Sequence, residues 1–591
     1  MTPSAAPAVD GRARLLLALA SVAVAFAAAD TYVVVLALPD MMASVGVPLD
    51  QLQRAAPIVS GFLLGYVAML PLIGRVADLR GRVPVLVAAL VLFSVGSLVT
   101  ALAYDMPSMV GGRFLQGVGG GGLVPATLAL VADLYPVERR GVPLGIVSAV
   151  QELGSVLGPL FGALVLAVAD WRAIFAVNLA VGLVLAAALQ VLPAPGGGPR
   201  RSSRSGPPDL VGMLLTLVVL AAGSLVFLQP PALMQDLTWG RLFIAVAGEG
   251  RWTTPLGLVT VAAAVLLAVR CATAARPLVD LRGWLRVMRE ADLTGALLLA
   301  AALSGVILAF ATADPRIEVF SDQGLWYLLG AAVATVAFAL HLVHADAPLV
   351  PRGALRRTPA WGSMLVSLLI GAALIAALID IPIFARTTVY PDSQLQAALV
   401  LVRFLVALPV GAVLGGYLTR ALPAGVVTAA GMACAAAGFV WMSGWGLTSL
   451  ESWTATVPLV LGGFGFGLAL APVNAAVLAT TDAAVHGLAS AFVVVARMVG
   501  MLVGISALTT LGLRQYYAEQ ADLPSAREVC DGASRCDAFT LLLREAGIAQ
   551  EHVVFLGAAW CAAAAGVLAL VLFRGAPTRG VATGETLRAS G

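Results

Sequence analysis

The stretch RFLQGVGGGGLVPATLALVADLYPVERRGVPLGIVSAVQELGSVLGP (113–159) recurs later in the chain, and this repeat decides the fold. When the sequence is shifted by 346 residues, six glycines of the stretch fall on six other glycines without a gap. Glycine is frequent here, with 62 residues, but six matches in one register are not expected by chance. The repeat therefore predicts two related bundles of helices. The matched pairs are Gly117–Gly463, Gly119–Gly465, Gly121–Gly467, Gly141–Gly487, Gly154–Gly500 and Gly158–Gly504.

The composition places these helices in a membrane. Of 591 residues, 60% are hydrophobic and only 11% are charged, whereas about 25% of the residues of a soluble protein are charged. The apolar residues form long blocks between short polar pieces, which is typical of an all-α polytopic membrane protein. We predict sixteen spans, near residues 15–40, 56–74, 84–104, 108–133, 142–168, 172–192, 210–228, 254–270, 291–312, 326–345, 361–385, 395–418, 423–444, 454–480, 487–511 and 552–573.

We expect three parts along the chain. Residues 1–195 form a first six-helix bundle, residues 196–358 form a linker with two inserted hairpins, and residues 359–591 form a second six-helix bundle with an outer loop at 512–550 and a cytoplasmic tail. Similar sequences follow the two hairpins, ARPLVDLRGWLR from residue 275 and DAPLVPRGALR from residue 346. We therefore interpret the second hairpin as a duplicate of the first.

The basic residues predict the orientation of the spans. All 35 are arginine, and most of them fall on one side of the predicted spans. Because cytoplasmic loops of membrane proteins are enriched in basic residues, we place the protein in the cytoplasmic cell membrane as a multi-pass protein with both termini in the cytoplasm. The polar stretch PAPGGGPRRSSRSGPP (193–208) is then expected to be a flexible cytoplasmic linker.

Several classes of function are disfavoured by the residues present. The chain contains no lysine, and a standard Walker A loop needs a lysine on the phosphates of ATP. A literal GxGxxG occurs at 117–122, but it lies inside an apolar span and indicates close packing of helices rather than a dinucleotide site. No catalytic-triad or zinc spacing is found. We expect no enzyme, no bound cofactor and no binding of nucleic acid.

One carboxylate lies in the middle of an apolar helix. Asp30 stands within AAADTYVVVLALPD (27–40), where a charge costs about 2.5 kcal/mol or more. It is either a functional group or a structural carboxylate paired permanently with an arginine. The shift of 346 residues maps Gln151 onto Arg497, so the neighbouring Glu152 should lie at a depth similar to that of Arg497. These two residues form a pair that opens and closes, a static pair, or two separate contacts.

Three further charges fall within predicted spans. Asp380 and Arg403 both lie in the outer third of their spans, and we expect them to pair with each other; alternatively, Asp380 is an interfacial carboxylate. Arg113 lies about one turn inside the fourth span, where it either assists the site or reaches back to the outer interface. The second bundle has Leu459 at the equivalent position, which favours a specific role for Arg113.

Several short motifs resemble those of the major facilitator superfamily, especially its drug:proton antiporters of fourteen spans. The first helix is similar to D-x-T-x-x-x-x-A-L-P, with Tyr32 in place of the threonine, and RFLQGVGGG (113–121) is similar to the fourth-helix motif. GRVADLRGR (74–82) resembles the superfamily's loop motif, and GSVLGPLFGA (154–163) resembles the antiporter motif G-x-x-x-G-P-x-x-G-G. The matching residues are Asp30, Ala37, Leu38 and Pro39; Gly74, Asp78, Gly81 and Arg82; Arg113; and Gly154, Gly158, Pro159 and Gly162.

The resemblance implies a proton-coupled exporter of lipidic, amphiphilic or drug-like compounds that works by alternating access. It implies that loop 74–82 latches the two bundles on the cytoplasmic side, and that the fifth helix packs tightly and bends at its glycines. We expect proton-coupling carboxylates at Asp30, Glu152 and Asp380, and charge partners at Arg113, Arg403 and Arg497.

DTYVVV, SVGVP and FLLGYVAMLPLIGR resemble one branch more closely, namely the mycobacterial exporters that move triacylglycerides with a lipoprotein partner. The expected partners are therefore a hydrophobic or lipid substrate, membrane lipids, and an extracytoplasmic lipoprotein received at the outer loop. The expected energy source is the proton gradient. The alternatives are an importer of the same fold and a membrane scaffold or assembly subunit that transports nothing.

Two pairs of residues outside these motifs carry separate expectations. Cys530 and Cys536 lie in the outer loop, within REVCDGASRCDAF (527–539), and we expect a disulfide because that side is oxidising. His341 and His344 are three residues apart on a predicted helix. This spacing could suit a metal, but a helix end at the cytoplasmic surface is the simpler interpretation.

Overall fold

The computed structural model describes residues 11–47, 56–192, 209–247, 250–274, 277–311, 323–391, 393–531 and 536–578. The predicted flexible linker at 193–208 and most of the predicted cytoplasmic tail lie outside these residues. The described part of the chain is helical throughout, and no strand occurs in it. The prediction of an all-α fold is therefore confirmed.

The long helices follow the predicted spans in number and order. Fifteen helices of the described residues are long and apolar enough to cross a membrane, and α5 is a further long helix between them. The sixteen are α1 (Gly11–Ser44), α2 (Ala56–Arg80), α3 (Arg82–Ala101), α4 (Met106–Leu134), α5 (Gly141–Val168), α6 (Trp171–Val191), α7 (Leu210–Leu228), α9 (Pro255–Thr273), α11 (Leu293–Ala311), α12 (Gly324–His344), α13 (Thr358–Thr387), α14 (Gln394–Leu418), α15 (Ala424–Met442), α16 (Thr456–Thr480), α17 (His486–Ala521) and α19 (Asp537–Leu572).

The predicted repeat is a structural repeat of two six-helix bundles. Helices α1–α6 form the first bundle and α13–α17 with α19 form the second, and the closest helix pairs of one bundle recur in the other. A Cβ atom at Gly117 of α4 would overlap the carbonyl oxygen of Phe62, and one at Gly463 of α16 would overlap that of Phe404. The matched glycines therefore allow the same close crossings of helices in both bundles.

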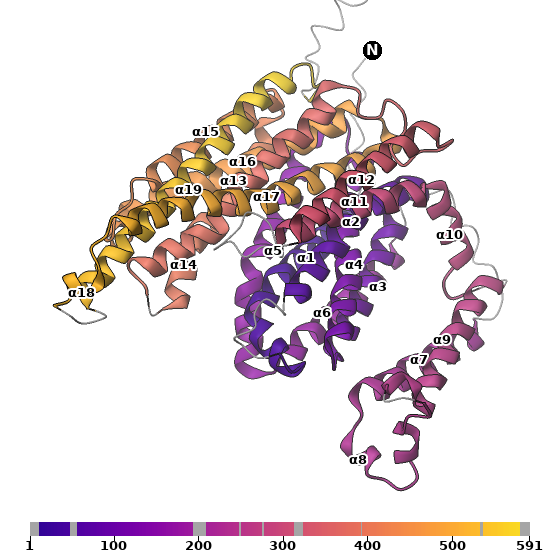
Figure 1. Ribbon diagram of the computed structural model, residues 1–591. Coiled ribbons are helices and arrows are strands. Elements are labelled where there is room, and N and C mark those ends of the chain that lie inside the picture. The colour runs from indigo at the N-terminus through magenta and orange to yellow at the C-terminus, as the bar shows by residue number, and fades with distance from the viewer. Residues whose placement is uncertain are drawn as a thin grey trace, which may run out of the picture.

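The two bundles touch near one end and diverge toward the other (Figure 1). Helix α2 crosses α17 and α5 crosses α14, at points marked by Gly74 against Gly487 and Gly141 against Gly416. We call this the Asp78 end, because Asp78 lies at the α2–α17 crossing. We call the opposite end, which carries Cys530 and Cys536, the disulfide end.

The four inserted helices form two hairpins with different surroundings. Helices α11 and α12 pair with each other, and α11 also packs on α2 and α17. Helices α7 and α9 pair with each other and stand away from the first bundle in Figure 1. At the disulfide end this hairpin is held by Arg251, whose guanidinium lies 3.8 Å from the ring centroid of Tyr104, and by an edge-to-face contact between Tyr104 and Phe227.

A short amphipathic helix, α10 (Leu281–Glu290), joins the two hairpins at the Asp78 end. Asp280 caps its first turn by accepting a hydrogen bond from the backbone N–H of Gly283 at 2.9 Å. Arg80, the last residue of α2, lies 4.4 Å from the ring centroid of Trp284 and 3.4 Å from the carboxylate of Asp280. The first hairpin is therefore attached to the first bundle at both ends.

The predicted outer loop is largely helical, as the residues TLLLREAG (540–547) and the tyrosines Tyr516 and Tyr517 suggest. Helix α17 continues to Ala521 and α19 begins at Asp537, so both helices have 36 residues and extend past the predicted spans. Between them lie the short helix α18 (Ala526–Val529) and a disulfide between Cys530 and Cys536. The sequence signal for the longer helices is TLLLREAG, in which apolar residues recur with helical spacing.

Candidate functional site

Asp30 lies at the centre of a buried polar network in the first bundle. Its side chain is almost fully buried, with 1% of the residue exposed. The carboxylate accepts hydrogen bonds from Arg113 at 2.7 Å and Gln116 at 2.9 Å, both on α4, and from the amide of Asn178 on α6. Three helices of the bundle thus meet at one carboxylate.

Arg113 turns into the bundle rather than toward the outer interface. Its guanidinium, on a residue that is 1% exposed, donates to Gln116 at 2.6 Å and lies 4.4 Å from the ring centroid of Phe62. The alternative in which Arg113 reaches the interface is therefore wrong for this structure. Gln116 also donates to Ser97 at 3.0 Å, so the network continues into α3.

The antiporter motif forms the wall beside Asp30. A Cβ atom at Gly154 would overlap the carbonyl oxygen of Ala25, and one at Gly158 would overlap that of Ala29. Helix α5 therefore crosses α1 at backbone contact, one residue before Asp30. Gly162 is buried on the same helix, and the side chain of Pro159 lies outside the described residues.

Glu152 and Arg497 lie on opposite bundles, on α5 and α17, and both are buried, with 8% and 9% of the residue exposed. Their charges interact with each other and with the buried hydroxyl of Tyr66 on α2. No ion pair joins them in the part of the chain that the structure describes. The predicted similarity in depth agrees with this arrangement, and a pair that opens and closes stays a prediction.

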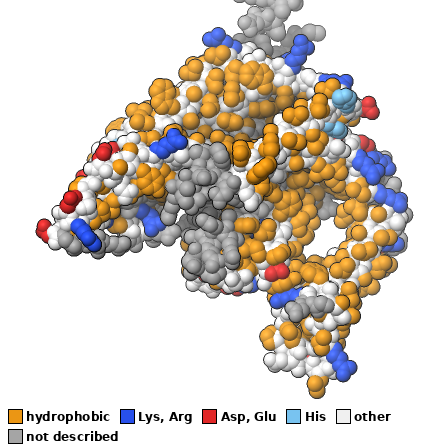
Figure 2. Space-filling model, in the orientation of Figure 1, with side chains coloured by type: hydrophobic (Ala, Val, Ile, Leu, Met, Phe, Trp, Pro, Cys, Tyr) orange, Lys and Arg blue, Asp and Glu red, His pale blue; other side chains and the backbone are white. Residues whose placement is uncertain are grey.

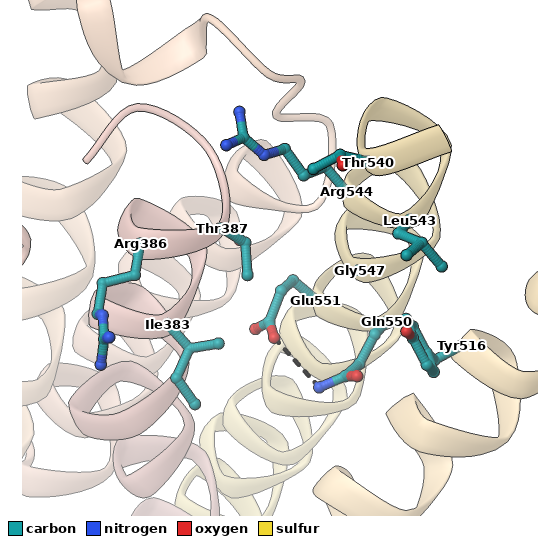
Figure 3. Close-up of a pocket in the computed structure, with 10 residues that line it drawn as sticks. All are labelled: Ile383, Arg386, Thr387, Tyr516, Thr540, Leu543, Arg544, Gly547, Gln550 and Glu551. Atoms are coloured by element: carbon teal, nitrogen blue, oxygen red, sulfur yellow. Dashed lines mark hydrogen bonds between the residues drawn. The ribbon is translucent and has the colours of Figure 1, made fainter. Parts of the chain in front are cut away.

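Asp380 does not pair with Arg403, so that prediction is wrong. Arg403 donates to the hydroxyl of Thr456 at 3.2 Å, because its helix α14 packs on α16. Asp380 is 4% exposed and lies beside α19, where its carboxyl group neighbours that of Glu551. Glu551 is 1% exposed and borders the pocket shown in Figure 3.

The loop motif connects the two bundles at the Asp78 end. Asp78 accepts hydrogen bonds from the backbone N–H groups of Gly487 at 2.8 Å and Leu488 at 3.0 Å, at the N-terminus of α17. It also pairs with Arg82, which donates to the carbonyl of Ala483 at 3.3 Å. A carboxylate is favourable there because the helix dipole places partial positive charge at an N-terminus.

The other predicted residues of this loop have geometric roles. Gly74 faces Gly487 so closely that a Cβ atom on either would overlap the backbone of the other. Gly81 ends the turn between α2 and α3 with a φ of 95°, a conformation that favours glycine. Arg82 also pairs with Asp133 at 3.2 Å, which the sequence had not singled out.

Four site residues were not predicted from the sequence: Gln116, Asn178, Asp133 and Glu551. Gln116 and Asn178 are amide side chains inside apolar spans, and a polar side chain at such a position is the sequence signal that could have identified them as site residues. Glu551 lies between the predicted outer loop (512–550) and the predicted last span (552–573), so the sequence predicts no role for it. His341 is hydrogen-bonded to the carboxylate of Asp292 at 2.8 Å. Among the described residues, no group of three or more His, Cys, Asp or Glu side chains is placed to hold a metal ion.

Comparison with known proteins agrees with this architecture. Residues 20–348 match the Major Facilitator Superfamily. The chain is 35% identical to a triacylglyceride transporter of Mycolicibacterium hassiacum, over 85% of this chain and 81% of that protein. It is 34% identical to a triacylglyceride transporter of Mycobacteroides abscessus, over 86% of this chain and 84% of that protein.

The fold also resembles a solved structure. The proton:xylose symporter XylE superposes with a TM-score of 0.51 at 14% identity, over 98% of this chain and all of that chain. At this identity the likeness concerns the fold alone. The two bundles, the loop and helix motifs and the extended similarity to transporters show that this chain is a member of the Major Facilitator Superfamily.

Proposed function

We propose that this protein is a proton-coupled exporter of lipidic or amphiphilic compounds across the cytoplasmic membrane. The observation that carries the proposal is the buried Asp30 network, in which a carboxylate has Arg113 as its ion-pair partner. Intramembrane carboxylates are costly and commonly mark proton pathways. Proton uptake would remove the negative charge that holds Arg113, and proton release would restore the pair.

Alternating access follows from the way the bundles meet. With the Asp78 end in the cytoplasm, the structure is closed toward the cytoplasm and its bundles diverge toward the outside (Figure 1). The bonds from Asp78 and Arg82 to the start of α17 then stabilise this outward-facing state. Opening inward requires these bonds to break, and the Glu152–Arg497 interaction lies on the same interface between bundles.

A lipidic substrate is supported by the surface of the first bundle. An apolar cavity of about 1080 Å³ lies between α2, α3 and α6 on one side and α10 on the other. Figure 2 shows hydrophobic side chains on both sides of the opening between this bundle and the first inserted hairpin. In a bilayer such an apolar opening is filled by hydrocarbon chains, and relatives of this chain are named triacylglyceride transporters.

The long helices α17 and α19 are the proposed place where an outgoing lipid or an extracytoplasmic lipoprotein is received. Deletion of residues 520–545 should lower lipid export while leaving the amount of protein in the membrane unchanged. A Cys530→Ser/Cys536→Ser variant keeps the helices and separates loss of the disulfide from loss of the surface. Unchanged export by the deletion variant would dispose of this role.

The function is tested in everted membrane vesicles loaded with protons by respiration. Addition of an amphiphilic substrate should release protons from vesicles with the wild-type protein, and Asp30→Asn should abolish the release. A scaffold gives no response with either protein. An importer coupled by symport releases no protons when substrate is added outside everted vesicles, so this result would reject export.

Lipid analysis supplies the matching test in cells. Cells that lack this protein should retain lipid in the cytoplasmic membrane and lose it from the outer layers of the envelope. The wild-type gene should restore the distribution, and the Asp30→Asn variant should not. An unchanged lipid distribution in these cells would argue against a lipidic substrate but not against proton coupling.

A further inference from the structure

A small pocket opens near the disulfide end of the second bundle. It has a volume of about 300 Å³ and lies between α13, α17 and α19. Its lining includes Arg386, Tyr516, Arg544 and Glu551, and Figure 3 shows Glu551 directed toward α13. Polar groups therefore lead from the surface to a buried carboxyl group.

Glu551 has few partners for its charge. Its Oε1 accepts from the amide of Gln550 at 3.3 Å, while its buried Oε2 receives a hydrogen bond from no N–H or O–H group in the described residues. The remaining neighbour is the carboxyl group of Asp380, whose negative charge acts directly on Glu551. Two ionised carboxylates offer each other only acceptors, so these two groups can hydrogen-bond only when one of them holds a proton.

The cations near this pair are engaged elsewhere or remain at the pocket surface. Arg386 and Arg544 line the pocket, and neither forms an ion pair with a described acidic residue. His552 on α19 bonds to the carbonyl of Trp445 at 2.6 Å instead. Tyr516 reaches the pocket from α17. Two adjacent carboxylates with no counter-ion cannot both stay ionised in a buried site.

We infer that Asp380 and Glu551 form a second proton-binding site, which exchanges protons with the disulfide side through this pocket. The pair holds one shared proton and carries a single negative charge. Uptake of a second proton from pocket water makes the pair neutral, and its release restores the single charge. No oxidant, reductant or other reactant takes part.

This inference rests on the proposed function for its role in transport, because two separate sites would allow more than one proton per cycle. The Asp30 network and the carboxyl pair lie in different bundles and share no described residue. Asp30 carries an arginine partner and the pair carries none, so the two sites would bind protons under different conditions. The proton count of the transporter is then the sum of two independent sites.

The site is tested first without transport, by infrared spectroscopy of the purified full-length protein in lipid. The wild-type spectrum at neutral pH should contain a protonated-carboxyl band that is lost or shifts in frequency in both Asp380→Asn and Glu551→Gln, because the surviving acid has no second carboxyl group with which to share a proton. Glu545→Gln, an exposed acid on the same helix, is the matched control. A band unchanged in both pair variants would overturn the inference.

Access through the pocket is tested by filling it. Gly547 lines the pocket, and a Cβ atom there would meet no other atom within 4 Å, so the side chain added by Gly547→Leu starts in open space. This variant should keep the protonated-carboxyl band and slow its exchange in D2O by about tenfold or more. Exchange at the wild-type rate would overturn the proposed route.

Proton counting then separates this inference from the proposed function. Glu551→Gln should lower the number of protons moved per substrate in proteoliposomes by about half, and thermal melting should confirm that the variant folds. An unchanged ratio would overturn the coupling of this site. If the wild-type protein shows no proton-driven transport, the proposed function fails, while the infrared band still decides whether the site exists.

Discussion

The two bundles share one scaffold but carry opposite electrostatic arrangements on their first helices. Gly154 and Gly158 pack on Ala25 and Ala29 of α1, and the matched glycines of α17 pack on Leu368 and Ala372 of α13. In this register Asp30 corresponds to Ala373, and Asp380 lies seven residues farther along its helix. At about 1.5 Å per residue, Asp380 is roughly 10 Å nearer the disulfide end.

The partners differ as much as the positions. Asp30 is neutralised by Arg113, whereas the equivalent of Arg113 in the second bundle is Leu459 and the neighbour of Asp380 is another acid. The first arrangement places a carboxylate against a cation, and the second places two acids side by side. The repeat thus sets the packing of the helices in both bundles. Differences at single positions within the repeat decide which bundle holds an ion pair and which holds two neighbouring acids.

The largest expected effect comes from removing the charge at Asp30. Asp30→Asn keeps the shape of the side chain but cannot exchange a proton, so gradient-driven transport should fall by at least about 100-fold. The measurement is substrate-induced proton release in everted vesicles at equal protein levels. Transport at full strength in this variant would contradict the comparison, because Asp30 would then be only a structural partner of Arg113.

The next effect comes from making the first bundle resemble the second at one position. Arg113→Leu copies the residue at Leu459 and leaves Asp30 buried without its cation, which should cost about 3–5 kcal/mol of stability. The double variant Asp30→Asn/Arg113→Leu should recover most of this stability without recovering transport. Thermal unfolding in detergent measures both. Equal stability of Arg113→Leu and the wild type would show that the pair is dispensable for folding.

The two bundle crossings at the Asp78 end offer a second internal comparison. At the α2–α17 crossing Asp78 accepts two backbone hydrogen bonds from α17, whereas at the α5–α14 crossing a Cβ atom at Gly141 would meet Thr419 and the backbone of Gly416. Hydrogen bonds to a charged group contribute about 1.5–3 kcal/mol. Asp78→Ala should therefore shift the equilibrium toward the inward-facing state by at least about tenfold.

Spectroscopic distances between labels on the two bundles measure this shift. Thr419→Val at the other crossing is the matched control, and it should change the equilibrium by less than about threefold because a neutral hydroxyl is removed. Equal effects of the two variants would show that the crossings are held by helix packing rather than by the charge of Asp78.

The sequence was sufficient for most of the fold because the relevant signals are local. Long apolar blocks predict helices, and the glycine register predicts which helices cross, so the order of the long helices and the two bundles follow from the sequence. The motif residues Asp78 and Arg82 contact the second bundle at Gly487, Leu488 and Ala483. Helix ends were less predictable, since the helical pattern of α17 and α19 continues into polar residues.

Side-chain partners were harder to predict because they depend on the rotation of each helix. Asp380 and Arg403 both fall in the outer third of their predicted spans, but Asp380 neighbours Glu551 of α19 and Arg403 donates to Thr456 of α16. Depth follows from sequence position, whereas facing direction follows from which neighbours a helix packs against. For the same reason the amides of Gln116 and Asn178 were not assigned to Asp30, although their polarity inside apolar spans was visible.

The smallest expected effect concerns an acid outside the membrane spans, and it separates functional from structural carboxylates. The backbone N–H of Gly283, with Arg80, holds the pKa of Asp280 below its usual range. A lowered pKa means that the carboxylate stays ionised at neutral pH, and its contribution to stability is lost only as pH falls below about 4.

Asp280→Asn should therefore leave the shape of the transport–pH profile between pH 5 and 8 unchanged. The transport rate of this variant should change by less than about twofold. Asparagine still caps α10, and an exposed ion pair contributes at most about 1 kcal/mol. If Asp280→Asn flattened the pH profile, proton coupling would involve the start of α10, which joins the two hairpins. The assignment of proton coupling to Asp30 would then be weakened.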